Sequence, residues 1–385
     1  MAETIKGFSD YTGEEARKRQ IIKEILVEEF EKYGFEPAET PIIENRDFVI
    51  GDNSEDEAIS DVFKLEDKGK RKLALRYELT FPLKRISKNK KLPYKRYSIG
   101  SVFRDEPVGG NRVRQITQAD IDIISSGTRE EAEILSIAKK ILDRLRIKAK
   151  IIFNNRKLLN EILEKTNINL EDREQAIREI DKLDKLPEIE VRNNLRKLGL
   201  DADKLLEIIK KPLSYFVKYK SYNEIKELVD YCKLYNLEIE FSASLARGLS
   251  YYTGSIFEIK GEMKETICAG GSYLVNSIFS TGISFGIERL AKITKIPIEN
   301  NVVLIISLNQ DKKAISLAEK LRGEGKNIRI SFDKLTKGLD LANSLEIKKV
   351  IIIGEDEVKK KKYKLKDMDS GKEKMLGEKE LVNLF

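Results

Sequence analysis

Residues 247–258 read Arg-Gly-Leu-Ser-Tyr-Tyr-Thr-Gly-Ser-Ile-Phe-Glu, a combination that a solvated turn rarely carries. Gly248 and Gly254 give the backbone freedom in φ, and Arg247 supplies a planar fork suited to a phosphate or a carboxylate. Tyr251 and Tyr252 should point to opposite faces of an extended segment, so that at most one lies fully in the core. Taken alone, the stretch fits two interpretations equally: a tyrosine-rich core strand after a glycine turn, or a binding motif.

The composition indicates a globular, soluble protein with more than one domain. At 385 residues the chain is too long for one compact core, so we expect two or three domains. No apolar run is long enough to span a membrane. The N-terminus, Met1–Thr4, lacks the apolar core of a signal peptide. We therefore expect a cytoplasmic protein without a membrane partner.

Charge and side-chain inventory limit the chemistry. The net charge of +7 permits a polyanionic partner without requiring one. Residues 301–385 hold 19 Lys and Arg against 14 Asp and Glu, so most of the excess lies where an RNA contact would be convenient. The absence of histidine excludes His-based catalysis and His metal ligands. Cys232 and Cys268 have neither metal spacing nor a disulfide pattern, so no metal site built from protein side chains is predicted.

Hydrophobic periodicity outlines the first part of the chain. Apolar spacing predicts a helix over 14–33, with Gly34 capping its C-terminus. Further patterns predict a strand over 39–44, an extended segment over 72–76, a helix over 80–86 with Pro82 in its first turn, and a helix over 129–146. Residues 97–104 and 113–124 are typical of two long strands in a hairpin with a charged tip.

The later part of the chain changes character twice. Short charged helices without strand signals predict a helical insertion over 153–237, and strands resume near 238. After Pro297, apolar runs at 302–308, 328–332 and 350–353 alternate with helices at 312–323 and 336–345, which is typical of a small α/β domain with a largely parallel sheet. The predicted division is therefore 1–152, 153–237, 238–297 and 298–385.

A first chemical block covers residues 76–85, Arg-Tyr-Glu-Leu-Thr-Phe-Pro-Leu-Lys-Arg. Glu78 and Thr80 place a carboxylate and a hydroxyl two residues apart at a strand-to-helix junction, where they can jointly grip an ammonium group. The alternative is that Thr80 caps the following helix. Both interpretations can hold together.

A second block covers residues 97–107 and 111–122. Arg104 ends one strand of the predicted hairpin, while Arg112 and Arg114 start the next, so three guanidinium groups should converge on one face or tip. Such a cluster suits a triphosphate, because arginine offers paired donors.

The second strand of this hairpin carries a polar row. Gln118, Asp120 and Asp122 share one face because side chains alternate along a strand. Their apolar neighbours favour a lined pocket over the alternative, a charged face exposed to solvent.

A third block joins Ala269-Gly270-Gly271-Ser272-Tyr273 to residues 281–290. Gly282 and Gly286 allow a flat ligand to approach the backbone closely, and Arg289 lies beside that approach in the first turn of a helix.

In order and spacing, these blocks resemble the motifs of class II aminoacyl-tRNA synthetases in their histidyl form. Residues 34–44, with Pro41, resemble motif 1, which forms the dimer interface; residues 97–122 resemble motif 2, and 282–290 motif 3. The segment 247–252 resembles the histidine-specific signature. Gly7–Tyr11 and Ile351–Glu357 also resemble the family, the latter its anticodon-binding domain. The resemblance implies an α+β fold: an antiparallel sheet with flanking helices, a helical insertion and a C-terminal α/β domain.

The resemblance also implies a reaction and a site. The reaction is activation of histidine with ATP and Mg²⁺ and transfer to tRNA(His), by a homodimer. ATP would be held by Arg104 at the α-phosphate, Glu106 at the adenine amino group, Arg289 at the γ-phosphate, and Arg112. Histidine would be held by Glu78, Thr80 and Gln118 around its ammonium, by Asp122, Tyr251 and Tyr252 around its imidazole, and by Arg247 at its carboxylate. Arg247 and Arg104 would be the catalytic residues.

Some positions depart from the family pattern. Ser250 stands where the family has aspartate, Ser272 and Leu274 replace an arginine and an aspartate, and the loop tip Val108-Gly109 lacks polar side chains. One alternative is a paralogue that resembles the histidine-sensing regulatory subunit of ATP phosphoribosyltransferase. The C-terminal domain and the intact arginines argue against it. A ligase for another amino acid is disfavoured by the Gln118/Asp122 and Tyr251/Tyr252 pairs.

Overall fold

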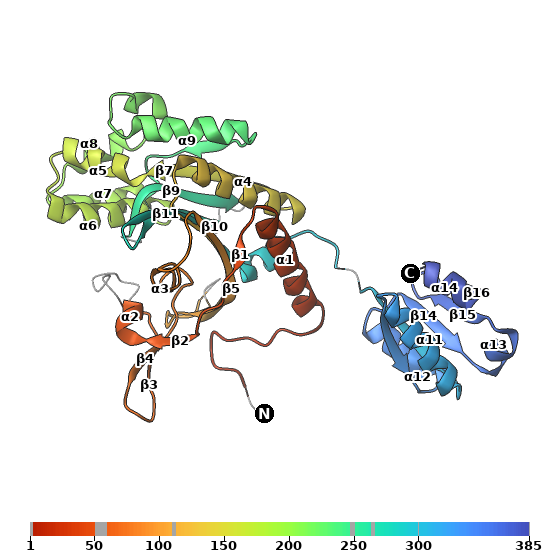
Figure 1. Ribbon diagram of the computed structural model, residues 1–385. Coiled ribbons are helices and arrows are strands. Elements are labelled where there is room, and N and C mark those ends of the chain that lie inside the picture. Colours follow the sequence, from red (N-terminus) through yellow and green to blue (C-terminus); the bar gives the residue numbers. More distant parts are fainter. Residues whose placement is uncertain are drawn as a thin grey trace. The chain divides into compact units, whose positions relative to one another are not determined.

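The computed structural model describes residues 3–50, 60–109, 113–246, 251–262, 266–298 and 300–384. The chain forms two compact units, Met1–Ile296 and Pro297–Phe385, and each is described by itself (Figure 1). In the described part of the chain, no helix is both long and apolar enough to cross a membrane.

The first unit is built on a sheet of eight strands in the order β1-β5-β6-β11-β10-β9-β7-β8. In that order the strands are Glu36–Pro37, Tyr94–Phe103, Gln115–Ile124, Ile278–Gly286, Thr266–Val275, Tyr252–Gly261, Ala149–Asn155 and Ile239–Phe241. The six strands from β5 to β7 pair antiparallel, and only β1 and β8 join parallel at the edges. This antiparallel sheet with flanking helices confirms the predicted α+β class.

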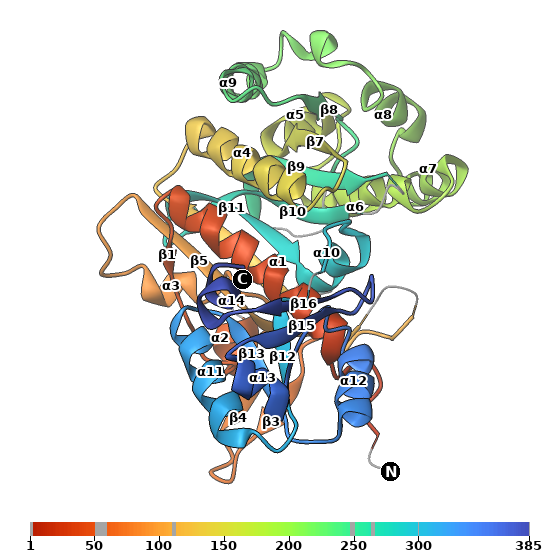
Figure 2. The same cartoon turned by 90° about the vertical axis from the view of Figure 1, so that its right-hand side faces the viewer.

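Three helices cover one face of the sheet: α1 (Gly13–Lys32), α4 (Thr128–Arg144) and α10 (Ile287–Ile293) (Figure 2). Gly34 has a φ of 77° just after α1, which is the left-handed conformation that glycine supplies at a helix end. Phe30 of α1 packs on Tyr97 and Phe285 of the sheet, with ring centroids 5.6 and 6.0 Å apart. Three odd-numbered residues of β6, Ala119, Ile121 and Ile123, are fully buried in this layer. The residues with even numbers therefore face the other side of the sheet.

A small sheet, β2-β4-β3 (Ile43–Asn45, Lys72–Leu75 and Lys64–Glu66), precedes the segment that carries the first chemical block. The strand predicted over 39–44 is thus shorter and later than expected. Helix α3 begins at Leu83, with Pro82 at its N-cap and no side-chain capping bond. The alternative in which Thr80 caps this helix is therefore wrong, because Pro82 occupies the N-cap and no side chain caps the helix.

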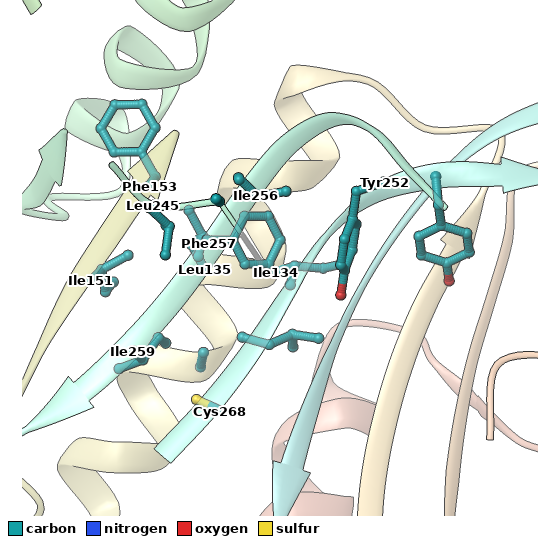
Figure 3. Close-up of a cluster of buried hydrophobic side chains, with 14 of the residues drawn as sticks. Ile134, Leu135, Ile151, Phe153, Leu245, Tyr252, Ile256, Phe257, Ile259 and Cys268 are labelled. Atoms are coloured by element: carbon teal, nitrogen blue, oxygen red, sulfur yellow. The ribbon is translucent and has the colours of Figure 1, made fainter. Parts of the chain in front are cut away.

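The predicted helical insertion contains α5 (Arg156–Lys165), α6 (Leu170–Asp181), α7 (Glu188–Lys197), α8 (Ala202–Ile208) and α9 (Tyr222–Leu234). Residues 153–155 instead complete β7, because Phe153 pairs with Phe257 of β9 in the sheet. The apolar residues of these helices join the core of the sheet. Figure 3 shows part of that core, where Ile134 and Leu135 of α4 lie near Ile256 and Phe257.

The second unit has a five-stranded sheet in the order β13-β12-β14-β15-β16. Its strands β12 (Val302–Ser307), β13 (Asn327–Ser331) and β14 (Lys349–Ile353) are parallel, and α11 (Asp311–Gly323) and α12 (Leu335–Ser344) connect them. This confirms the predicted β-α-β-α-β order. Two antiparallel strands, β15 (Tyr363–Asp367) and β16 (Glu373–Leu376), and helices α13 (Glu355–Lys360) and α14 (Glu378–Leu384) complete the unit. The sequence did not predict β15 and β16, since lysines separate their few buried residues.

Candidate functional site

Polar residues from three neighbouring strands meet on the sheet face opposite α1. The strand register sets side by side the rows Arg96–Asp122–Gly282, Ser98–Asp120–Ser284 and Gly100–Gln118–Gly286. Asp120 and Asp122 are 4% and 2% exposed, so this face is a buried polar surface and not a solvated one. The predicted lined pocket is therefore favoured over the charged exposed face.

Asp122 is held by two protein partners. Arg96 Nη2 lies 2.5 Å from Asp122 Oδ2, and the Tyr273 hydroxyl donates a hydrogen bond to Oδ1. Burial raises the pKa of Asp122, and the charge of Arg96 opposes that rise. A Cβ atom on Gly282 would lie 2.2 Å from Oδ1, so glycine is required beside this carboxyl.

Arg96 is a site residue that the sequence analysis missed. It is 1% exposed, and its Nη2 also donates to Leu79 O at 2.9 Å. Its position along the strand could have predicted this. Arg96 lies two residues before Ser98 and four before Gly100, so it shares a strand face with them and should be buried if that face lines a pocket.

Glu78 reaches this surface from the segment between β4 and α3. It is 8% exposed, and burial raises its pKa to about 8, helped by the charges of Asp120 and Asp122 and opposed by those of Arg104 and Arg96. Its Oε1 atom has no hydrogen-bond partner among the described residues. Thr80, also predicted as a site residue, is half-buried, and its carbonyl accepts a hydrogen bond from Leu83 N at 2.9 Å.

Gln118, Ser284 and Asp120 form a hydrogen-bonded chain. Gln118 Nε2 donates to Ser284 Oγ at 2.8 Å, and Ser284 in turn hydrogen-bonds the carboxyl of Asp120. Burial raises the pKa of Asp120 to about 7, with the largest opposing effect from Arg96. Gln118 Oε1 and Asp120 Oδ1 are buried and have no partner in the described part of the chain.

The predicted arginine cluster is only partly described. Arg104 lies with its guanidinium carbon 4.6 Å from the centroid of the Tyr77 ring, a cation–π arrangement, and its buried Nε has no partner among the residues placed. Arg114 instead ties down the loop, because its Nη2 lies 3.2 Å from Asp105 and its Nε donates to Glu106 O at 3.1 Å. Arg112 lies outside the described residues, so the convergence of three guanidinium groups stays a prediction.

Arg289 is the third residue of α10, as predicted for the first turn of a helix. Its side chain is exposed, and its Nη1 donates a hydrogen bond to Thr266 O at 2.5 Å. The side chain passes over Gly286, where a Cβ atom added to the glycine would lie 3.9 Å from Arg289 Cγ. The half-buried Glu106, predicted beside it in the ATP site, follows β5 in the loop.

The two tyrosines of the opening stretch lie on the same side, which corrects the prediction that they face apart. Strand β9 begins at Tyr252, so Tyr251 precedes the strand and does not follow its alternation. Their ring centroids are 4.7 Å apart, and the Tyr251 ring is 5.6 Å from that of Tyr273. Burial and the charge of Glu78 raise the pKa of Tyr251, so the tyrosines adjoin the carboxyl surface. Arg247, Gly248 and Ser250 lie outside the described residues.

Ser272, which departs from the family pattern, is buried and donates a hydrogen bond to Glu131 of α4. It follows Gly271 in β10 and faces the layer of α4, whereas Tyr273 faces Asp122. Leu274 is 43% exposed beside Phe279 of β11. In the part of the chain that is placed, no three His, Cys, Asp or Glu side chains gather closely enough to hold a metal ion.

Comparisons with known proteins cover both units. Residues 7–290 match the family model described as histidyl-tRNA synthetase, and residues 299–385 match that of an anticodon binding domain. The chain is 32% identical to histidine–tRNA ligase 2 of Shouchella clausii, over 96% of this chain and 97% of that protein.

Solved structures are similar over most of the chain. A crystal structure of histidyl-tRNA synthetase from Nostoc sp. PCC 7120 matches with a TM-score of 0.87 and 26% identity, over 99% of this chain and 98% of that one. A structure described as an ATP phosphoribosyltransferase regulatory subunit/histidyl-tRNA synthetase from Bacillus halodurans C matches with a TM-score of 0.77 over 89% and 96% of the two chains. At 20% identity, the second likeness concerns the fold alone.

Proposed function

The chain belongs to the histidyl-tRNA synthetase family of aminoacyl-tRNA ligases, and we propose that it activates histidine with ATP to histidyl-adenylate and transfers the histidyl group to tRNA(His). The observation that carries this proposal is the buried polar surface of β6. Glu78 Oε1 and Gln118 Oε1 are buried acceptors without a donor among the described residues, which costs free energy unless a ligand supplies one. An amino acid brings such donors in its ammonium group.

In the proposed complex, the ammonium of histidine binds Glu78, Thr80 and Gln118, and the imidazole lies against Tyr251 and Tyr252. Asp122 faces the imidazole as an acceptor that Arg96 and Tyr273 hold in place. A substrate without an imidazole N–H leaves this buried carboxyl without its third hydrogen-bond partner. Such a substrate therefore binds less tightly than histidine, which supports discrimination between amino acids.

ATP binds, in the same proposal, to Arg104 at the α-phosphate and to Glu106, Arg112 and Arg289. Mg²⁺ enters with the phosphates of ATP, and no described side-chain cluster is assigned to it. Tyr77 supports the orientation of Arg104, because a guanidinium stacked on a ring loses fewer conformations on binding.

Two anions must meet in the first step. The histidine carboxylate attacks the α-phosphorus, the bond to the β-phosphate oxygen breaks, and pyrophosphate leaves. Arg104 and Arg247 offset the repulsion between the two anions and the charge that develops in the transition state. In the second step a terminal ribose hydroxyl of tRNA attacks the activated carbonyl, and AMP leaves.

The Pro297–Phe385 unit is the proposed tRNA contact. Its match to an anticodon binding domain and the excess of basic residues over 301–385 support this role. We also propose a homodimer that works in the cytoplasm. Ile42 and Ile43, which follow the motif 1-like Pro41, are 47% and 51% exposed, and a partner subunit on this segment would bury them.

The test is ATP–pyrophosphate exchange with each of the twenty amino acids, without tRNA. Exchange with histidine alone supports the ligase, and Arg247→Ala should abolish it while leaving thermal unfolding unchanged. Histidine binding without exchange would instead support the regulatory paralogue. Exchange that persists in Arg247→Ala would refute the role given to that arginine.

A further inference from the structure

Asp120 is a buried carboxyl that the proposed reaction leaves without a task. It lies on β6 between Gln118 and Asp122 on the same face, about 6.6 Å of strand from each. It is 4% exposed and makes no ion pair with any residue that the structure describes. Burying a carboxyl without a charged partner is costly, so its retention on this surface calls for a ligand.

Three of the unsatisfied atoms around Asp120 share one chemical character. Asp120 Oδ1, Glu78 Oε1 and Gln118 Oε1 are all acceptors, all buried, and all lack a donor within the described ranges. The charge of Asp120 raises the pKa of Glu78, and the hydrogen-bonded chain through Ser284 ties Asp120 to Gln118. An alkylammonium has three N–H donors, which is the complement of three such acceptors.

Two nearby cations, Arg96 and Arg76, already have partners, while Arg96 Nε, Arg96 Nη1 and Arg104 Nε are buried donors without a hydrogen-bond partner among the described residues. Arg96 pairs with Asp122 and Leu79 O. Arg76, whose side chain lies over Gly100, donates from Nε to Ser101 O at 2.7 Å and from Nη1 to Thr40 O at 2.9 Å. Glu78 and Asp120 make no ion pair with any described residue, so a cationic ligand can neutralise them.

We propose that Asp120 is a further acceptor for the ammonium group of the substrate, in addition to Glu78, Thr80 and Gln118, and that it makes the site select ligands that carry this group. The inference rests on the proposed function and adds a binding residue to it. In this arrangement Ser284 is a positioning residue, which orients the carboxyl of Asp120 through its hydrogen bond.

The experiment compares two competitive inhibitors of exchange that differ only in the ammonium group: histidinol and imidazolepropanol. Asp120→Asn keeps the shape of the side chain but removes its charge. It should raise the inhibition constant of histidinol about 10- to 100-fold, the effect of one charge-assisted hydrogen bond, and leave that of imidazolepropanol unchanged. Ser284→Ala should give a smaller loss with the same selectivity.

Two further variants, Asp122→Asn and Ser284→Ala, and the wild type separate the possible failures. Asp122→Asn, which alters the imidazole side, should weaken both inhibitors alike. If Asp120→Asn also weakens both alike, or weakens neither, the proposal is overturned. If Asp120→Asn does not fold, equal weakening of both inhibitors in Ser284→Ala overturns it instead. A wild-type protein that binds no histidinol and shows no exchange would count against the proposed function itself.

Discussion

Arg96→Met should destabilise the Met1–Ile296 unit by about 3–5 kcal/mol at pH 8, because it removes one partner of a buried ion pair. Arg96 and Asp122 are 1% and 2% exposed and lie 2.5 Å apart. The methionine fills much of the volume, so the cost arises mainly from the carboxyl that is left without its cation. Leu79 O loses its donor as well.

The loss should depend on pH. Arg96 lowers the pKa of Glu78, Asp120 and Asp122, which burial has raised to about 8 for Glu78 and about 7 for Asp120. A raised carboxyl pKa contributes stability that is present below the unfolded pKa and is lost as pH rises through the folded one. Without Arg96 the folded pKa values rise further, so the deficit should be smaller at pH 5.5 than at pH 8.

Differential scanning calorimetry can measure this effect across pH 5.5 to 8.5. The transition of the Pro297–Phe385 unit should stay unchanged and serve as an internal reference. Arg71→Met is the matched control, since Arg71 pairs with Asp67 at 2.6 Å but its side chain is 80% exposed. It should leave both transitions where they are.

The double variant Arg96→Met/Asp122→Asn should recover part of the lost stability, because it also removes the carboxyl left unpaired. A deficit below about 1 kcal/mol at pH 8, or one that does not change with pH, would refute the view that the ion pair offsets the buried carboxyls. A double variant whose loss of stability equals the sum of the losses in the two single variants would refute it as well.

Three further changes test the same surface. The ligand-free protein should lose stability between pH 6 and 8.5, as Glu78 ionises through a folded pKa of about 8, and Glu78→Gln should show a flatter dependence of the calorimetric midpoint on pH; equal slopes would contradict this. Gly282→Ala should cost about 1–3 kcal/mol in urea unfolding and lower histidine-dependent exchange, because its Cβ would lie 2.2 Å from Asp122 Oδ1; normal stability and exchange would show that the strand yields freely. Tyr77→Leu should raise the KM for ATP up to about tenfold with little change in the KM for histidine, since it removes the ring beside Arg104; a change in the histidine KM alone would contradict the stacking role.

Local sequence patterns predicted much of the fold. The period of two along the strand predicted over 113–124 placed Gln118, Asp120 and Asp122 on one face, and the structure places them so. The resemblance of the blocks, in order and spacing, to the class II synthetase motifs predicted the family and the antiparallel sheet, and both predictions are confirmed. The prediction that depended on an extended backbone at Tyr251 was wrong, because Tyr251 lies in a turn just before β9.

The sequence by itself determined which residues line the sheet, since alternation along a strand is a local property. Only the tertiary structure decided what those residues do to one another. It brought Arg96 of β5 against Asp122 of β6, and Glu78 against Asp120, through strand register and a connection from another sheet. The ion pairs and the pKa values of these side chains depend on their distances and burial. Both are fixed only when segments distant in the sequence fold over the same face of the sheet and exclude water.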